Sequence, residues 1–304
     1  MSNEEIIRFP RTEHLEDSRL GAGDSASGRV KLASQAGRWM VAEEKVDAAN
    51  AGVSFPGGRM LLQSRGHSLG GGSREKQFSR FKVWAEAHED ALRAALGGRY
   101  VMYGEFMAAL HTVYYDKLPH YFMEFDVFDR EAGKFLSTRA RQLLLKDAPV
   151  VQVPVLWEGQ APSRMKTLKA LVGPSLCRSP QWRDALRVAA ARAGADVERT
   201  LAQADKSEEM EGLYVKVESG GWTVDRFKWV RPSFVQAIME SGSHWADRPI
   251  VVNGLRGDVD LYAPVINWET PGITGRDGLG GYKALSSLAP VEPVRPGLAA
   301  GSRP

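Results

Sequence analysis

The sequence predicts an α+β protein built of antiparallel sheets flanked by helices. Short stretches rich in apolar, β-branched and aromatic residues are bounded by glycine and proline, which is typical of strands and turns. Residues 74–96 instead carry apolar residues at helical spacing and end at Gly97-Gly98. The chain shows neither an internal repeat nor a coiled-coil heptad. This mixture of strands and helices favours the α+β class.

The first strand is expected after a polar, irregular stretch, residues 1–35, that drapes over the domain. Residues 39–46 form this strand. Because strand side chains alternate, Val41, Glu43, Lys45 and Asp47 share one face, and Lys45 can point into one pocket with its carboxylate neighbours. The later strands are expected as a hairpin of 51–55 and 59–64, then 100–107, 121–129 and 150–157, and a second hairpin of 212–218 and 223–230.

The organisation of the chain follows from its breaks. A helical stretch from about 165 to 204, interrupted by glycine and proline, predicts a helical insertion of about 160–205 within a main domain of residues 1–232. Residues 233–284 are expected to form a small cap that is helical over 233–241. Residues 285–304 are rich in proline, alanine, glycine and serine, which predicts a flexible tail.

Composition excludes several classes of protein. No apolar run approaches the ~20 residues that span a bilayer, and the N-terminus lacks a signal-peptide core, so a cytoplasmic protein without a membrane partner is expected. The single cysteine, Cys177, excludes an intramolecular disulfide and a cysteine-based zinc cluster. A net charge of +3 does not by itself predict nucleic-acid binding, which depends on where the charge lies.

Lys45 is the residue to which the chemistry points. A lysine is protonated near neutral pH, and it becomes a nucleophile only when desolvation or nearby positive charge lowers its pKa. Lys216, Arg226 and Lys228 could supply that charge from elsewhere in the chain. Lysine beside carboxylates, with distant basic residues, is the layout needed for an amine that attacks a nucleotide phosphate.

Six segments in order resemble the motifs of the covalent nucleotidyltransferases, which include the ATP-dependent polynucleotide ligases and the mRNA capping enzymes. They are Lys45-Val46-Asp47-Ala48, Ser64-Arg65-Gly66, Tyr103-Gly104-Glu105, Phe122-Met123-Glu124-Phe125-Asp126, Glu211–Lys216 and Arg226-Phe227-Lys228. Glu44 before the lysine and Asn50 after it make the chain look closest to nick-sealing RNA ligases of the bacterial type. The resemblance implies a nucleotidyltransferase domain over residues 1–232. No C-terminal oligonucleotide-binding (OB) barrel is expected, because the residues after Arg231 do not alternate well.

The resemblance implies an ATP-dependent RNA ligase that joins 3′-hydroxyl and 5′-phosphate ends, in RNA repair. Lys45 would carry AMP in a lysyl-AMP intermediate, and the AMP would pass to the RNA 5′ end before the 3′-hydroxyl displaces it. The implied cofactors are ATP and Mg²⁺ or Mn²⁺. The implied partners are RNA ends or a nicked duplex, and a monomer is expected.

The same resemblance assigns roles to residues. Lys45 would be the catalytic nucleophile and Glu211 the metal ligand, with Asp126 a weaker candidate for the metal. The implied nucleotide-binding residues are Glu44, Asp47, Arg65, Glu105, Phe122, Lys216, Arg226 and Lys228. Of these, Glu105 would bind the ribose hydroxyls and Phe122 would stack on adenine. The implied nucleic-acid contacts are Asn50, Arg65 and Arg231.

The sequence departs from the family pattern at two positions. Ala48 stands where the first motif has glycine, a residue usually needed for a positive φ or a close approach. Arg226 stands where the last motif has its first lysine. Arginine keeps its charge more firmly than lysine and can bind two oxygens at once, so Arg226 can take the place of the lysine.

Other interpretations remain open at this point. A capping-like guanylyltransferase shares the covalent lysine, and a non-catalytic ligase-like protein that binds nucleic acid would share the fold. For individual residues the alternatives are structural: Lys45 paired with Glu43 or Asp47, Phe122 packed in the core, and the other charged residues solvated on strands.

Overall fold

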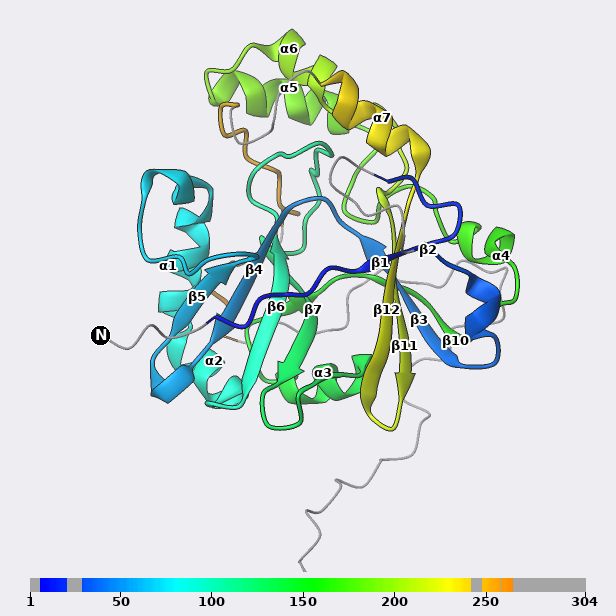
Figure 1. The fold of residues 1–304 in the computed structure, drawn as a ribbon. Coiled ribbons are helices and arrows are strands. Elements are labelled where there is room, and N and C mark those ends of the chain that lie inside the picture. The colour runs from blue at the N-terminus through cyan, green and yellow to red at the C-terminus, as the bar shows by residue number, and fades with distance from the viewer. Residues whose placement is uncertain (1–5, 21–28, 242–247, 258, 265–304) are drawn as a thin grey trace, which may run out of the picture. The chain divides into compact units, whose positions relative to one another are not determined.

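Twelve strands form one mixed sheet in the residues that the computed structural model describes, 6–20, 29–241, 248–257 and 259–264 (Figure 1). The strands are β1 Glu13–Leu15, β2 Arg29–Val30, β3 Trp39–Lys45, β4 Ala49–Ser54, β5 Leu61–Ser64, β6 Tyr100–Phe106, β7 Phe122–Asp129, β8 Lys134–Leu136, β9 Val151–Gln152, β10 Val155–Gln160, β11 Gly212–Ser219 and β12 Trp222–Val230. The main path, β10-β3-β11-β12-β8-β7-β6-β4-β5, is antiparallel. The predicted α+β class is confirmed.

The sheet consists of two halves that β8 joins at one end. β8 pairs with β12 at Trp222 and Thr223, and with β7 at Phe128 and Asp129. One half contains β10, β3, β11 and β12, and the other contains β7, β6, β4 and β5. Towards the far end of β12 the two halves have no direct strand pairing in the main path, and the cavity described below lies there.

Two segments outside the main path pass from one half to the other. Residues 6–12, which we call the strap, are tied to β5 and β6 and continue into β1, which pairs in parallel with β12. Residues 151–160 run from β9, which pairs with β7, into β10, which pairs with β3. Residues 1–35 were expected to be irregular, yet they contain β1 and β2. β1 pairs with the distant β12, and β2 pairs with β1, which local sequence does not reveal.

The residues of β3 alternate between an apolar core and a polar face. Met40 is fully buried in an apolar cluster on one face of β3, β11 and β12. Glu43 and Lys45 lie on the opposite face, in register with Tyr214 and Gly212 of β11. The predicted placement of Glu43 and Lys45 on one face is therefore confirmed.

The helices pack around this sheet. They are η1 Leu32–Gln35, η2 Pro56–Gly58, η3 Ser73–Phe78, α1 Ser79–Ala87, α2 Glu89–Leu96, α3 Thr138–Leu145, α4 Met165–Lys169, α5 Trp182–Arg192, α6 Val197–Gln203 and α7 Pro232–Glu240. On α1, the rings of Phe81 and Trp84 stack on Phe122 of β7 at centroid distances of 5.2 and 5.1 Å. Helices α5, α6 and α7 gather together at the top of Figure 1.

Two predicted elements are interrupted. The helix expected over 74–96 consists of η3, α1 and α2, because the backbone at His88, with φ −114° and ψ 16°, leaves the helical region. The strand expected over 150–157 is divided into β9 and β10 at Val153 and Pro154. Proline has no backbone N–H to donate to a neighbouring strand, which accounts for the gap.

The residues after β12 begin with α7 and then return to the main domain. Asn253 donates a hydrogen bond from its side chain to the Met107 carbonyl (2.7 Å) and accepts one from the Tyr115 amide (3.0 Å). Residues 248–257 thus pack against the main domain. The rest of the expected cap, 265–284, and the expected tail, 285–304, lie outside the described residues. No described helix is both long and apolar enough to cross a membrane.

Candidate active site

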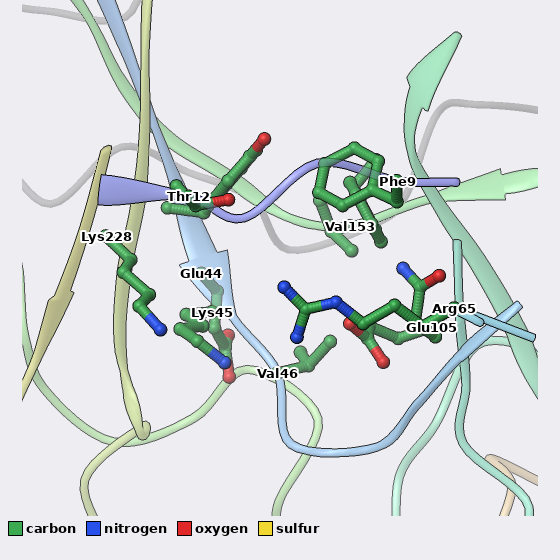
Figure 2. Close-up of a pocket in the computed structure, with 12 residues that line it drawn as sticks. Phe9, Thr12, Glu44, Lys45, Val46, Arg65, Glu105, Val153 and Lys228 are labelled. Atoms are coloured by element: carbon green, nitrogen blue, oxygen red, sulfur yellow. The ribbon is translucent and has the colours of Figure 1, made fainter. Parts of the chain in front are cut away.

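A cavity of about 130 Å³ lies between the two halves of the sheet (Figure 2). One side of it is apolar and aromatic, and the other carries charged and polar groups. The lining residues are Phe9, Thr12, Glu44, Lys45, Val46, Asn50, Arg65, Glu105, Phe125, Val153, Tyr214 and Lys228. The arrangement suits a ligand with a flat apolar part and an anionic part.

Lys45 ends β3 at the edge of this cavity. Its Nζ lies 2.7 Å from Glu211 Oε1, and its side chain keeps 24% of its surface exposed. The backbone around Glu211 is close-packed: a Cβ on Gly212 would lie 1.9 Å from the Trp229 carbonyl oxygen. Only glycine fits there, so Gly212 lets β11 and β12 approach closely just where Glu211 meets Lys45.

The pKa of Lys45 is raised. Burial lowers this pKa, but the nearby carboxylates of Glu211, Glu105 and Asp47 raise it more. Lys216, Arg226 and Lys228 were expected to lower the pKa of Lys45, and that expectation is wrong in this structure. Carboxylates, not cations, are the charges that dominate around Lys45.

The carboxylates of Glu105 and Glu211, beside Lys45, are incompletely hydrogen-bonded. Burial raises the pKa of Glu105 to about 8 and that of Glu211 to about 7, although the charge of Lys45 lowers both. The Oε2 atom of each is buried without a hydrogen-bond partner. Such oxygens are costly to bury, and they are suited to accept a hydroxyl hydrogen bond or a cation.

Glu44 and Asp47, next to Lys45, use their carboxylates within the protein. Glu44 accepts hydrogen bonds from the Ser175 hydroxyl and the Leu176 amide. Asp47 accepts from the amides of Thr112 (2.7 Å) and Val113 (2.8 Å). Both carboxylates therefore fix the loops around Lys45, and Glu44 also lines the cavity.

Phe125, not Phe122, faces the cavity. Phe122 is 0% exposed and packs against α1 on the other side of the sheet. The family resemblance implied Phe122 for adenine stacking, but β7 contains a bulge: Tyr103 pairs with Asp126, and Gly104 already pairs with Glu124. The extra residue is Phe125, which lines the cavity beside Tyr214.

A buried charge network lies beneath the cavity. Lys216 is 0% exposed, and its Nζ lies 2.9 Å from Glu43 Oε2 and 3.3 Å from Asp126 Oδ1. Arg141 of α3 bonds Glu43 (2.6 Å) and both oxygens of Glu124 (2.7 Å). Lys216 and Asp126 therefore form an ion pair with each other, and neither lines the cavity. Sequence reasoning missed Arg141, because its partners are far away in the chain.

The remaining predicted residues divide into two groups. Asn50, Arg65 and Lys228 line the cavity, and Asn50 stands opposite Glu105 in the pairing of β4 with β6. Arg231 is only 2% exposed and bonds Asp205, Ser233 and the Met210 carbonyl, so it cannot contact nucleic acid in this structure. Its prediction as a nucleic-acid contact is wrong.

The comparison with known families decides what kind of chain this is. Residues 38–230 match the RNA ligase family. The chain belongs to the RNA ligase family. No curated protein matches it.

The solved structures similar to this chain include mutants of the Naegleria gruberi RNA ligase. One, with ATP and Mn, has 16% sequence identity and a TM-score of 0.48, and the match covers 75% of this chain and 63% of that one. An apo mutant has 16% identity and a TM-score of 0.45, with 67% and 52% covered. A mutant with AMP and Mn has 15% identity and a TM-score of 0.44, with 75% and 63% covered. This chain thus spans between about half and two thirds of their length.

The part of the chain that matches the RNA ligase family runs from just before β3 to the end of β12. It contains Lys45, Glu211 and most of the cavity. Phe9 and Thr12 lie outside it, although both line the cavity. Sequence reasoning missed these two because the 1–35 segment carries no strong pattern.

Proposed function

We propose that this member of the RNA ligase family is an ATP-dependent ligase that joins RNA 3′-hydroxyl and 5′-phosphate ends. The observation that carries the proposal is Lys45, whose amino group lies at the edge of a cavity, 2.7 Å from Glu211, in a family of ligases. The proposed substrates are RNA ends or a nicked duplex, and the proposed role is RNA repair by a monomer.

The first step joins Lys45 to AMP. Lys45 Nζ, having lost its proton, forms a bond to the α-phosphorus of ATP, while the bond from that phosphorus to the bridging oxygen breaks. Pyrophosphate leaves with the electron pair. The AMP then passes to an RNA 5′-phosphate, and a 3′-hydroxyl displaces it to close the backbone. Positioning and charge neutralisation supply most of the rate in such transfers.

The cavity divides these tasks among its walls. Phe125 and Tyr214 form an apolar side on which adenine can stack, and Glu105 with Asn50 presents polar atoms to the ribose. Lys228 and Arg65 are the cations positioned for phosphate oxygens. We assign adenine stacking to Phe125 in place of Phe122, because its ring lies in the cavity.

A divalent metal fits this site at Glu211. The buried Oε2 of that carboxylate has no hydrogen-bond partner, and hard cations such as Mg²⁺ and Mn²⁺ prefer carboxylate oxygens. No group of three or more potential ligand side chains gathers within the described residues, so phosphates and water would complete the coordination. When bound, the ion would offset the negative charge that keeps Lys45 protonated.

The test is incubation with α-labelled ATP and Mg²⁺ or Mn²⁺, followed by denaturing electrophoresis. A covalent adduct on the parent chain, and none on Lys45→Ala, supports the ligase. A parallel reaction with α-labelled GTP separates the capping-like alternative. Absence of any adduct, with nucleic-acid binding intact, would favour a ligase-like binding protein. A labelled protein should then be chased with nicked RNA to see the label leave and the nick close.

A further inference from the structure

The strap runs along the cavity, which its Phe9 and Thr12 line, and is held at both ends. On one side the Ile7 carbonyl accepts hydrogen bonds from Gln63 Nε2 (2.8 Å) and the Tyr103 hydroxyl (2.7 Å). On the other side the chain continues into β1, where Glu13 and His14 pair with β12. Figure 1 shows this segment running across the sheet, and Figure 2 shows Phe9 and Thr12 on it above Lys45. The strap thus connects the two halves of the sheet over the cavity.

Phe9 is the residue through which the strap forms part of the apolar wall of the cavity. Its ring lies 5.1 Å from Phe125 in an edge contact and 5.1 Å from Tyr103, and it is 8% exposed. Phe9 and Phe125 both line the cavity. Phe9 therefore extends the apolar side of the cavity beyond the residues that match the RNA ligase family.

The guanidinium group of Arg226 packs against the rings of Phe9 and Phe135. Its guanidinium carbon lies 3.7 Å from the centroid of the Phe135 ring and 5.1 Å from that of Phe9. Its Nη1 is buried without a hydrogen bond and lies 3.7 Å from Asp126 Oδ2. A flat guanidinium stacks on aromatic rings in a way that a lysine ammonium does not. Arg226 is absent from the cavity lining, so its contacts are with the aromatic residues that hold the strap.

We propose that the strap retains the nucleotide: Phe9 forms the outer wall for the purine ring of a nucleoside triphosphate, and Arg226 is the positioning residue that holds Phe9 in place. The proposal rests on the proposed function, because the ligand is the ATP of the first step. It also accounts for arginine at position 226, where the resembling motif has lysine. The reacting atoms are at Lys45, so the strap should govern ATP binding and leave the chemical step unaffected.

The experiment measures ATP affinity and chemistry separately. Equilibrium binding of a non-hydrolysable ATP analogue, and the adduct-forming rate as a function of ATP concentration, are compared for the parent, Phe9→Ala, Phe9→Tyr and Arg226→Lys. Arg99→Lys is the matched control, since Arg99 also lies over an aromatic ring, Tyr100, at 5.2 Å but does not line the cavity. Thermal unfolding of each variant confirms that it is folded.

We expect Phe9→Ala to weaken analogue binding and raise the KM for ATP by ~10-fold, with the rate at saturating ATP within ~3-fold of the parent. Arg226→Lys should raise KM by ~3–10-fold, Phe9→Tyr, which keeps the ring, should lose less affinity than Phe9→Ala, and Arg99→Lys should stay near the parent. Unchanged affinity in Phe9→Ala and Arg226→Lys, or a lower saturating rate at unchanged KM, would overturn the proposal.

The two proposals fail in different ways. If the parent binds the analogue and Phe9→Ala weakens that binding, but no adduct ever forms, the strap retains its role and the ligase activity is rejected. If the parent forms adduct and Phe9→Ala binds equally well, the ligase stands and the strap proposal is rejected. A parent chain that binds no ATP analogue overturns both.

Discussion

Two groups of buried charges sit on the same side of β3, and they differ in how completely they are paired. In the network beneath the cavity, Lys216 and Arg141 are shared among Glu43, Glu124 and Asp126 at 2.6–3.3 Å. At the cavity, by contrast, Lys45 pairs with Glu211 at 2.7 Å and lies near Glu105, and each of these carboxylates keeps a buried oxygen without a hydrogen-bond partner. In the network, Glu43 Oε2 and Asp126 Oδ1 also lack hydrogen-bond partners, but each lies within 3.3 Å of Lys216 Nζ. At the cavity, the ion pair of Lys45 reaches only Oε1 of Glu211, so its carboxylates are less completely paired.

The two groups therefore have different roles: the network stabilises the fold, and the cavity charges are available for chemistry. Removing one member of a complete buried pair leaves an uncompensated charge, which is strongly destabilising. Neutralising a carboxylate that already lacks partners removes a cost instead. Substitutions in the two groups should therefore change stability in opposite directions, and only those in the cavity should act mainly on ATP.

The largest effect on stability is expected from the network. Arg141→Ala leaves Glu43 and Glu124 buried without their shared cation, so the free energy of unfolding should fall by about 3–5 kcal/mol. Urea denaturation measures this. Lys146→Ala, at an exposed lysine just after α3, is the control and should stay within about 0.5 kcal/mol of the parent. Equal stabilities of Arg141→Ala and the control would show that the network contributes nothing.

The next effect concerns rate rather than stability. Lys228→Ala removes a cation from the cavity wall, and losing one preorganised electrostatic partner typically costs ~10²–10³ in rate. Adduct formation with labelled ATP should fall by that factor while the unfolding temperature stays near that of the parent. Lys166→Ala, on the exposed surface of α4, is the matched control. A fall of only a few-fold would place Lys228 among ordinary surface charges.

A smaller effect of opposite sign is expected at Glu105. Burial raises the pKa of Glu105 to about 8, well above its ordinary value of 4.5, so the folded state favours the protonated acid. The stability from this group is present below pH 4.5 and is lost as the pH rises through about 8. Glu105→Gln should therefore be more stable than the parent by about 1–3 kcal/mol at pH 9, and the gap should shrink towards pH 5.

The stability gain in Glu105→Gln should come with weaker adduct formation, since Glu105 lines the cavity. Glu131→Gln is the control, because Glu131 is 70% exposed and should show no such pH-dependent gap. A Glu105→Gln variant that is less stable than the parent at pH 9 would contradict the idea of an incomplete site.

The smallest effect is expected at Ala48. Its φ is not positive, so alanine causes no backbone strain where the family pattern has glycine. Ala48→Gly should lower the free energy of unfolding by about 0.5–1 kcal/mol, because glycine gains more freedom in the unfolded chain. Its rate of adduct formation should stay within ~3-fold of the parent. A fall of ~10-fold or more would show that the loop depends on the alanine methyl group.

Sequence alone predicted what short-range patterns encode. Alternation placed Glu43 and Lys45 on one face of β3, and glycine pairs marked the hairpin of β11 and β12. The motif order also predicted a family that the match over 38–230 confirms. The predictions of strand face and hairpin are correct because strand alternation and turn chemistry depend on neighbours in the chain.

What sequence could not predict depends on distant contacts. The motif resemblance pointed to Phe122, but Phe125, the extra residue of a bulge in β7, lines the cavity, and a bulge cannot be read from local sequence. Lys216 and Arg231 carry the charges expected of a site, but buried acids far along the chain hold them inside the protein. Phe9 reaches the cavity only because β1 pairs with β12, some two hundred residues away.

The proposed function depends above all on Lys45 as the residue that bonds to AMP. The direct measurement is mass spectrometry of peptides from the chain after incubation with ATP and Mg²⁺ or Mn²⁺, with the parent and Lys45→Arg treated alike. We predict AMP on the peptide that contains Lys45 in the parent, and no modified peptide in Lys45→Arg. AMP on another lysine, such as Lys228, or adduct persisting at a comparable level in Lys45→Arg, would contradict the claim.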